Sequence, residues 1–424
     1  MAVRAAMFCG NCGSQVQIHQ HIFCSNCGTR TRRNQELSTN DTDERTIISH
    51  YFTRGYRYES ILEFLKIYHD IIISLSTLKR NLRQYGLHKK GVSSQTEDSI
   101  RSIIRNEING PSSLRGYRAT WNMLRSTYSI TVPRDVVMKI LREEDAEGTE
   151  QRRARRLSRR TYRSNGPNEI WHVDGYDKLK PYGLPIHGCV DGYSRRIIWL
   201  KLCKSNNNPV IPATFFMDAL TEFGLFPCLV RTDCGTENGI MAGIQCSLAN
   251  DVQAHRYGTS PSNQRIENWW SHFRRGYSGW VIDYFKEMVD DGDLVLGNNV
   301  HMEGIWYVYN IFFQAELDRI KTEWNAHFIR KSHNTTISGI PNELFLLPHI
   351  SNGVQCGIDV ADSLINQIIV QRDVYAESKA LYNDDGELLD YFQYIVNNEG
   401  LSYPPRTWAD AKSMYKIIMT ISGC

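Results

Sequence analysis

The sequence predicts an α/β catalytic core that follows a small metal-binding ribbon and two helical modules. Three observations support this class. Two CxxC pairs lie within the first 27 residues, apolar residues recur at helical spacing between residues 44 and 144, and short strands alternate with amphipathic helices from residue 168 onward. A chain of 424 residues is too long for one ordinary core, so two to four domains are expected.

Composition restricts the class of protein further. It is that of a soluble globular protein, with 41% hydrophobic and 22% charged residues. No run approaches the roughly 18 apolar residues of a membrane span, and the N-terminus lacks the apolar segment of a signal peptide. Seven of the eleven cysteines are scattered singly, which suits a reducing compartment. We therefore expect an intracellular protein without a membrane partner.

Residues 8–28 (FCGNCGSQVQIHQHIFCSNCG) have the spacing of a zinc ribbon. The predicted ligands are Cys9, Cys12, Cys24 and Cys27. Each CxxCG allows a tight turn that brings two thiolates to one ion, and four thiolates in a tetrahedral array select a structural Zn²⁺. His19 or His21 could replace a cysteine, but the paired symmetry favours the four sulfurs. The partner of such a ribbon stays open, because short ribbons bind DNA, RNA or protein.

Residues 44–90 predict three short helices that resemble a helix-turn-helix module. Gly55 separates the first two helices, Ser76 is the predicted N-cap of the third, and Gly86 lies where that helix should end. The third helix is basic. It would present Lys79, Arg80 and Arg83 to a DNA groove. The alternative is a helical bundle whose basic face is simply solvated.

Residues 94–144 predict a second helix-turn-helix-like module of similar size. Its helices are expected over Thr96–Ile108, over Ser113–Tyr128 and from Pro133 onward, because proline is tolerated at a helix start. The stretch GYRATWNMLRSTYSITVPRDVVMKILREE is similar to a segment that precedes the catalytic core of many insertion-sequence transposases. That resemblance strengthens the expectation of DNA binding.

A basic linker over residues 151–164 follows, with seven arginines in twelve residues (RRARRLSRRTYR). Blocks of like charge repel one another and usually belong to linkers or tails that contact polyanions. The residues that we expect to contact DNA here are Arg152, Arg153, Arg155 and Arg156. A merely solvated linker is the alternative.

From residue 168 the chain has the order of an RNase H-like core. A strand carries Asp174, a hairpin is expected over residues 187–202, and an amphipathic helix covers Pro209–Phe223. A buried strand then ends at Asp233, and a later helix carries Glu267. Adjacent strands would hold the two aspartates, and the packed helix would bring the glutamate to them.

Carboxylates at these positions suit phosphodiester chemistry. In-line displacement at a phosphate is anionic, and two divalent ions about 3.5–4 Å apart can activate the attacking oxygen and stabilise the leaving one. Mg²⁺ is a hard ion that prefers oxygen ligands and keeps several waters, so carboxylates from different elements form an adequate open site. Mn²⁺ is the alternative ion. No small-molecule cofactor is expected.

The motifs themselves resemble the retroviral-integrase core of the DDE superfamily. WHVDGYDK resembles its first-Asp strand, TDCGTEN its second-Asp motif, and SPSNQRIENWW its glutamate helix. Thirty-three residues separate Asp233 from Glu267, near the mid-thirties gap of that family. The resemblance implies that Asp174, Asp233 and Glu267 are the catalytic, metal-binding triad. The chain also resembles uncharacterised animal proteins with an integrase core, derived from mobile elements.

Two departures from the family stand out. The N-terminal module has four cysteines where retroviral integrases have a His-His-Cys-Cys site. Cys234 follows the second aspartate where many relatives carry Asn. After the core, which we place at residues 165–347, the stretch NAHFIRKSHNTTISGIPNELF resembles the segment that follows an integrase core. Residues 351–424 have no assigned role.

Several polar residues near the motifs are weaker candidates. Asp177 and Asp191 compete with Asp174, and Glu237 shares a loop with Asp233. Arg265, Arg274 and Arg275 on the glutamate helix are expected to meet DNA, as are the neighbouring Gln264 and Asn268, with a plain surface role as the alternative. We interpret His172 as a buried, hydrogen-bonded histidine, and Trp269 and Trp270 as core residues.

The sequence therefore favours an integrase- or transposase-like enzyme that cleaves and joins DNA with Mg²⁺ or Mn²⁺. By family resemblance it would act as a homo-oligomer on DNA, and a nuclear location is expected. The principal alternative is a domesticated DNA-binding or regulatory protein with little catalysis. A nuclease of RNase H type fits the metal site but leaves the helical modules unexplained.

Overall fold

The computed structural model describes most of the chain after residue 43. The described residues are 44–87, 97–110, 115–128, 130–145, 162–258, 263–331, 337–377 and 386–424. Two short strands, β1 (Met7–Phe8) and β2 (Gln15–Val16), pair antiparallel near the N-terminus. The four predicted zinc ligands and the predicted DNA-contacting arginines of residues 151–164 lie outside the described residues.

A five-stranded mixed sheet forms the centre of the molecule, in the order β5-β4-β3-β7-β8. Its strands are β3 (Ile170–Tyr176), β4 (Ile186–Asp191), β5 (Ile197–Leu202), β7 (Leu229–Thr232) and β8 (His255–Tyr257). The first three pair antiparallel, which confirms the predicted hairpin, and β7 and β8 run parallel to β3. The sheet and its flanking helices fit an RNase H-like α/β fold.

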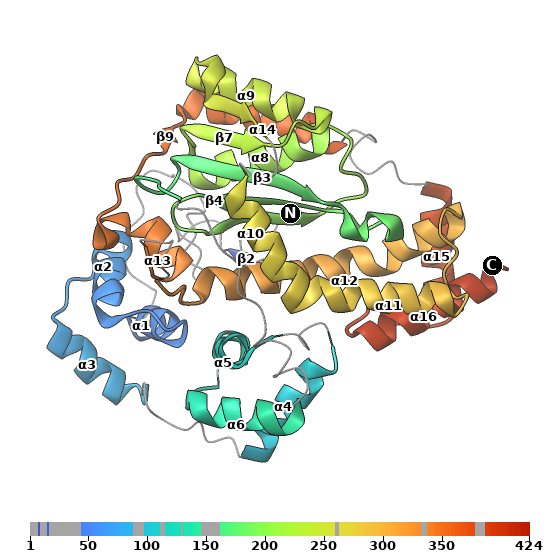
Figure 1. The fold of residues 1–424 in the computed structure, drawn as a ribbon, viewed down its shortest axis with the longest axis horizontal. Helices are drawn as coiled ribbons and strands as arrows, with labels where there is room; N and C mark the ends of the chain where they lie inside the picture. The colour runs from blue at the N-terminus through green and yellow to red at the C-terminus, as the bar shows by residue number, and fades with distance from the viewer. Residues whose placement is uncertain are drawn as a thin grey trace, which may run out of the picture.

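Helices cover both faces of this sheet (Figure 1). Alternate residues of a strand point to opposite faces, so Trp171 and Val173 join the core beneath α8 (Val210–Phe223). Helix α9 (Gly239–Ala249) and helix α14 (Asp362–Glu377) lie on this side as well. Tyr176 joins the other core, under α10 (Gln264–Phe273) and α12 (Asn299–Ala326).

The helix that carries Glu267 does not end at Phe273. It continues through a π-helical segment, Arg274–Ser278, into α11 (Gly279–Asp290). Tyr277 of the π-helical segment is fully buried in the larger core together with Phe285 and Phe313. Single π-helical turns within helices often occur near functional sites.

The described parts of residues 351–424 pack on the central sheet and its helices. Strand β9 (Ile358–Asp359) pairs with β6 (Leu225–Phe226), and α14 lies along α8. Helices α15 (Gly386–Asn398) and α16 (Trp408–Ile421) cover α12 and share its core. The C-terminal stretch therefore completes the hydrophobic core of the central domain, a role that its sequence did not reveal.

The first helical unit consists of α1 (Glu44–Thr53), α2 (Tyr58–His69) and α3 (Leu75–Gln84). The predicted N-cap, Ser76, is wrong. Ser74 has extended backbone angles, and its hydroxyl accepts a hydrogen bond from Thr77 N at 3.1 Å, so the helix begins at Leu75 and Ser76 already lies in its first turn. Gly86 has a φ of 73°, as a helix-ending glycine should.

The second helical unit consists of α4 (Glu97–Ile108), α5 (Tyr117–Ser126) and α6 (Arg134–Glu144). The helix predicted over Ser113–Tyr128 is shorter in the structure because Gly116 is extended and acts as its N-cap. The first unit packs on the segment around α13 (Pro341–Leu346), whereas the second contacts α12. None of the described helices is both long and apolar enough to cross a membrane.

Candidate active site

The first candidate carboxylate, Asp174, lies on the central strand of the sheet. It is half-buried and pairs in the β3–β4 ladder with Gly188. The same strand face carries His172 and Tyr176, since residues two apart share a face. Asp174 thus points toward α10, the helix that holds Glu267.

Three alternate residues of β3 bind successive parts of the glutamate helix. At its start, His172 Nδ1 hydrogen-bonds Asn263 Oδ1 at 2.8 Å. In its middle, Trp270 Nε1 donates to Asp174 Oδ2 at 3.0 Å. Past its end, the hydroxyls of Tyr176 and Ser278 hydrogen-bond at 2.6 Å. These three contacts fix α10 along β3 and so determine where Glu267 lies relative to Asp174.

The second candidate, Asp233, follows the last residue of β7. The register of β3 with β7 ends at His172 opposite Arg231, and each aspartate comes two residues later. Asp233 Oδ1 accepts hydrogen bonds from Gly235 N at 3.2 Å and from Asn238 Nδ2 at 3.0 Å. The parallel pairing of these strands therefore brings the two aspartates to the same edge of the sheet.

The carboxylate of Glu237 folds back over Gly235. A Cβ built on Gly235 would lie 2.0 Å from Glu237 Oε1, a contact that this flexible side chain could relieve by moving. Burial, together with the charges of Asp233 and Asp177, raises the pKa of Glu237. Asp233 and Asp177 are thus acidic neighbours of Glu237.

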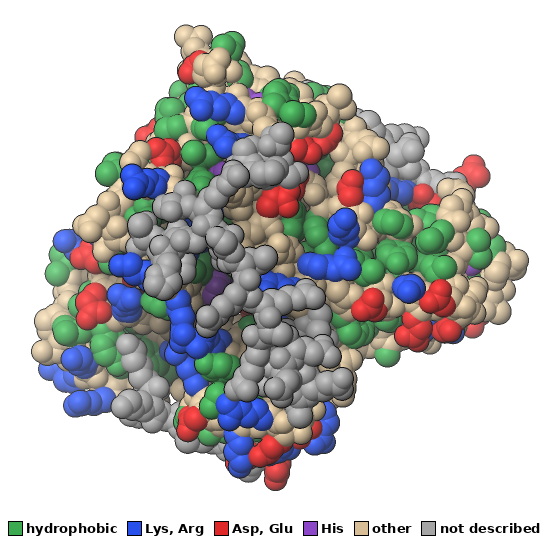
Figure 2. All heavy atoms as spheres, viewed as in Figure 1, with side chains coloured by type: hydrophobic (Ala, Val, Ile, Leu, Met, Phe, Trp, Pro, Cys, Tyr) green, Lys and Arg blue, Asp and Glu red, His purple; other side chains and the backbone are tan. Residues whose placement is uncertain are grey.

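The electrostatics of Asp174 show that the three predicted acids are neighbours. Burial, together with the charges of Glu267 and Asp233, raises the pKa of Asp174 to about 7, and hydrogen bonds from Trp270 and the Gly175 backbone offset part of that rise. Asp174 is therefore a buried carboxyl group with two acidic neighbours. Figure 2 shows Asp and Glu side chains gathered at the centre of this face, in the region of α10.

The donor set fits a hard divalent cation, because it consists of carboxylate oxygens whose repulsion a cation would offset. Within the part of the chain that the structure describes, no group of three or more His, Cys, Asp or Glu side chains is close enough to hold one ion. In their present positions, the charges of Asp233 and Glu267 act on Asp174, but the three carboxylates do not form a coordination sphere.

His172 is a buried, hydrogen-bonded histidine, as the sequence indicated. It is 0% exposed and hydrogen-bonds both Tyr162 and Asn263. Burial lowers its pKa to about 3, so it is neutral at physiological pH. Asn263 also links β3 to the start of α10. Its side-chain amide donates to Val173 O at 2.8 Å, and its backbone carbonyl accepts a hydrogen bond from Glu267 N.

The competing aspartate Asp191 has a different environment. It is fully buried at the hairpin turn, where its carboxylate accepts hydrogen bonds from Asn168 N, Ser194 N and Ser194 Oγ. It pairs across the ladder with Trp171, three residues before Asp174. These contacts make Asp191 the residue that closes the β4–β5 turn.

The arginines of the glutamate helix differ in their surroundings. Arg265 is half-buried, with its guanidinium 4.0 Å from the Tyr162 ring centroid and its Nε donating to Gly192 O. Arg274 and Arg275 are exposed, one turn beyond Ser271 on the side of the helix that carries Glu267. Trp269 and Trp270 are buried, as predicted.

The basic residues predicted on α3 are all exposed. Arg80 and Arg83 have no ionic or hydrogen-bonding partner among the described residues, and Lys79 Nζ lies 5.9 Å from the Tyr58 ring centroid. Figure 2 shows lysine and arginine side chains at the lower left, where Figure 1 places α3. Among the described elements, this helix packs mainly on α1 and α2.

Two groups of residues at the site escaped the sequence-based prediction. Trp270 was recognised as a core residue, but its hydrogen bond to Asp174 was not foreseen. Asn238, Asn263 and Gly188 were not singled out at all. Asn263 directly precedes the glutamate helix, and that position could have indicated a polar residue with a positioning role.

Comparison with known proteins agrees with this geometry. Residues 161–355 match the model of the integrase core domain family. The chain therefore contains an integrase core domain. No curated protein matches the chain.

Proposed function

We propose that this protein is a DDE-type integrase or transposase that cleaves and joins DNA with a divalent cation. The observation that carries the proposal is geometric. The parallel pairing of β3 with β7 brings Asp174 and Asp233 to one edge of the sheet, and the hydrogen bond from Trp270 to Asp174 holds the Glu267 helix against the same strand. Carboxylates from two strands and a packed helix of an RNase H-like domain, in a chain that matches the integrase core family, are what such chemistry requires.

Each part of the site has a distinct task in this proposal. The carboxylates of Asp174, Asp233 and Glu267 would hold Mg²⁺ or Mn²⁺. The bound ion would supply charge stabilisation at the phosphate and an activated oxygen nucleophile. The three hydrogen bonds from β3 to the glutamate helix and its continuation would hold Glu267 in place relative to the strand carboxylates. The hydrogen bonds from Gly235 and Asn238 would orient Asp233.

DNA would bind across two basic surfaces. The exposed Arg274 and Arg275 continue the helix face that carries Glu267, so they are suited to phosphates next to the reacting one. The outer face of α3 would enter a groove with Lys79, Arg80 and Arg83. Arg265 is a poorer candidate, since Tyr162 and Gly192 already hold its guanidinium. A structural Zn²⁺ at the four N-terminal cysteines, assembly as a homo-oligomer on DNA and a nuclear location belong to the same proposal.

The test uses purified full-length protein, Mg²⁺ or Mn²⁺, and DNA that carries the ends of the element flanking the gene. Strand nicking or joining is expected, and Asp233→Asn should abolish it while leaving DNA binding intact. Asp290→Asn is the matched control, because Asp290 is exposed on α11 and outside the acid cluster.

Binding without cleavage at any metal concentration would overturn the enzymatic part of the proposal and would favour a regulatory DNA-binding protein. Activity that survives Asp233→Asn would show that the cleavage comes from a different site or a contaminant.

A further inference from the structure

We infer that Trp270 is a positioning residue for the candidate metal site. Its indole N–H holds the Asp174 carboxylate at the orientation needed for binding a cation together with Glu267. This inference rests on the proposed function, and it assigns a role to a residue that otherwise looks like ordinary core.

The hydrogen bond is geometrically well defined. Trp270 Nε1 donates to Asp174 Oδ2 at 3.0 Å, and the tryptophan side chain is only 5% exposed. An indole has a single donor and no acceptor, so it can serve one carboxylate oxygen and leaves the other to different partners. Trp270 lies three residues after Glu267 on α10, which places the two side chains on neighbouring parts of the helix surface. Trp270 therefore connects the Asp174 carboxylate on β3 to α10, the helix that carries Glu267.

The sheet is shaped to accept this ring. Gly188 is the residue opposite Asp174 in the β3–β4 ladder. A Cβ built at Gly188 would lie 2.9 Å from Trp270 Cη2 and 3.1 Å from its Cζ2. The indole thus lies against the backbone of β4, in a space that any side chain at residue 188 would fill. This is an observation independent of the hydrogen bond, and it points to the same role.

Packing holds the ring from its other sides. The centroid of Tyr176 lies 4.9 Å from that of Trp270, and the centroids of Trp269 and Phe273 lie 4.8 and 5.9 Å away. Because the ring cannot turn, its N–H is a fixed donor. Outer partners of this kind orient the groups that bind a metal, and their loss typically costs about 10- to 100-fold in metal affinity.

The experiment measures Mn²⁺ binding to the full-length protein by isothermal titration calorimetry. Trp270→Phe keeps an aromatic ring but removes the N–H, and it should raise the Mn²⁺ Kd about 10- to 100-fold. The matched control is Trp199→Phe, the same change at a tryptophan of β5 that is 3% exposed. The indole N–H of Trp199 donates to His187 and not to a carboxylate, so its variant should bind Mn²⁺ like the wild type.

A second variant separates positioning from folding. Replacing Trp270 with 3-benzothienylalanine keeps the shape of the two-ring side chain and substitutes sulfur for the N–H. The thermal unfolding midpoint of the metal-free protein should stay near the wild-type value while Mn²⁺ affinity falls as it does in Trp270→Phe. Gly188→Ala, which displaces the Trp270 ring while both hydrogen-bonding groups stay in the chain, should also weaken Mn²⁺ binding.

The outcomes distinguish this inference from the function on which it rests. If the wild type binds Mn²⁺, Asp174→Asn does not, and the benzothienyl variant binds as tightly as the wild type, the inference is overturned and the metal site stands. If the wild type itself binds no Mn²⁺, the proposed function fails, and the role of Trp270 fails with it.

Discussion

The two three-helix units that precede the catalytic core look alike in sequence but use their charges differently. In the first unit, Arg80 and Arg83 are exposed and have no ionic partner among the described residues. In the second unit, the basic side chains of α4 pair with acidic ones of α6, as Arg101 does with Glu143 and Glu144. The first unit therefore exposes unpaired positive charges on α3, whereas ion pairs within the second unit neutralise much of the positive charge on α4.

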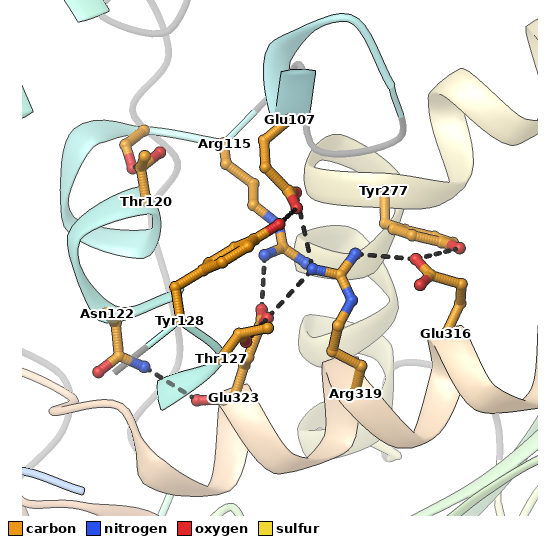
Figure 3. Close-up of polar contacts among 11 residues, drawn as sticks. Glu107, Arg115, Thr120, Asn122, Thr127, Tyr128, Tyr277, Glu316, Arg319 and Glu323 are labelled. Atoms are coloured by element: carbon orange, nitrogen blue, oxygen red, sulfur yellow. Dashed lines mark hydrogen bonds and ion pairs between the residues drawn. The ribbon is translucent and has the colours of Figure 1, made fainter. Parts of the chain in front are cut away.

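Their attachments to the core differ as well. The first unit is held by a hydrogen bond from Ser60 to Glu343 and by one from Tyr68 to Leu346 O. The second is locked to α12 by a buried ionic network (Figure 3). Arg115 lies 2.5 Å from Glu323, and Thr127 donates to the same carboxylate. These contacts attach the second unit firmly to α12 of the central domain.

The network extends from the second unit toward the glutamate helix. Arg319 of α12 contacts Glu107 of α4 at 3.6 Å and Glu316 at 2.8 Å, and Glu316 accepts a hydrogen bond from Tyr277. Tyr277 belongs to the π-helical segment that continues α10. The position of the second unit is therefore tied through shared side chains to the helix that carries Glu267.

The largest expected effect comes from breaking this attachment. Glu323→Ala leaves Arg115 buried without its partner, and removing one member of a buried ion pair typically costs about 3–5 kcal/mol. We expect a loss of that order in the free energy of unfolding, measured by denaturant titration. The control is Glu97→Ala, which breaks only exposed pairs and should change stability little. A loss for Glu323→Ala as small as that of the control would contradict a supporting role for the network.

The difference in charge pairing predicts which unit meets DNA. The double variant Arg80→Ala/Arg83→Ala should weaken DNA binding by about 10- to 100-fold, or about 1.4–2.8 kcal/mol. The slope of log affinity against log salt should fall by about two, because each of the two arginines would neutralise one phosphate in the wild type.

The matched control for that variant is Arg105→Ala/Lys139→Ala. It removes the same charge from the second unit, where both side chains pair with glutamates. Fluorescence anisotropy over a salt series would measure both variants. Equal reductions in DNA affinity for the two variants would mean that binding depends only on the net charge of the protein. The first unit would then have no special role in DNA binding.

Much of this arrangement followed from sequence patterns. The aspartates were placed on adjacent strands because strand periodicity and turn residues mark β3 and β7, and the spacing of Ile266, Trp270 and Phe273 marks the buried side of α10. The contacts that position the site could not be inferred in this way. Trp270 has the same apolar signature as Trp269, and only the approach of β3 to α10 makes one of them a hydrogen-bond donor to Asp174.

The packing of residues 351–424 was unpredictable for a related reason. Phe392 and Tyr415 are fully buried against α12, more than sixty residues earlier in the chain. Helix α16 has a clear capping box at Thr407 and Asp410, so a local signal marks its start. A helix start does not identify the partner against which the helix packs, and that information is held in distant parts of the sequence.

A smaller effect is expected where the two units touch. Arg125 of α5 donates from Nε to Thr53 O at 2.9 Å and from Nη2 to Phe52 O at 2.8 Å, both at the end of α1. Arg125→Met keeps much of the apolar stem but removes both hydrogen bonds, and we expect a loss of about 1–3 kcal/mol in the free energy of unfolding. Arg118→Met, at an exposed site on the same helix, is the control. If Arg125→Met unfolds like the wild type, the two units do not support each other through this contact.

The smallest expected effect is a loss of stability at low pH that comes from the ion pairs of the second unit. Hydrogen bonds from Arg105 and Arg101 lower the pKa of Glu144 to about 2 from an ordinary value near 4.5. Because the folded pKa is the lower one, these contacts contribute their full stability above about pH 4.5 and lose it as the pH falls toward 2. Glu144→Gln should therefore flatten the decline of the thermal midpoint over that range, whereas Glu399→Gln, at an exposed residue outside both units, should leave the decline unchanged. An unchanged slope in Glu144→Gln would mean that the pairing seen in the second unit does not persist in solution, and the contrast between the two units would then rest on the α12 attachment alone.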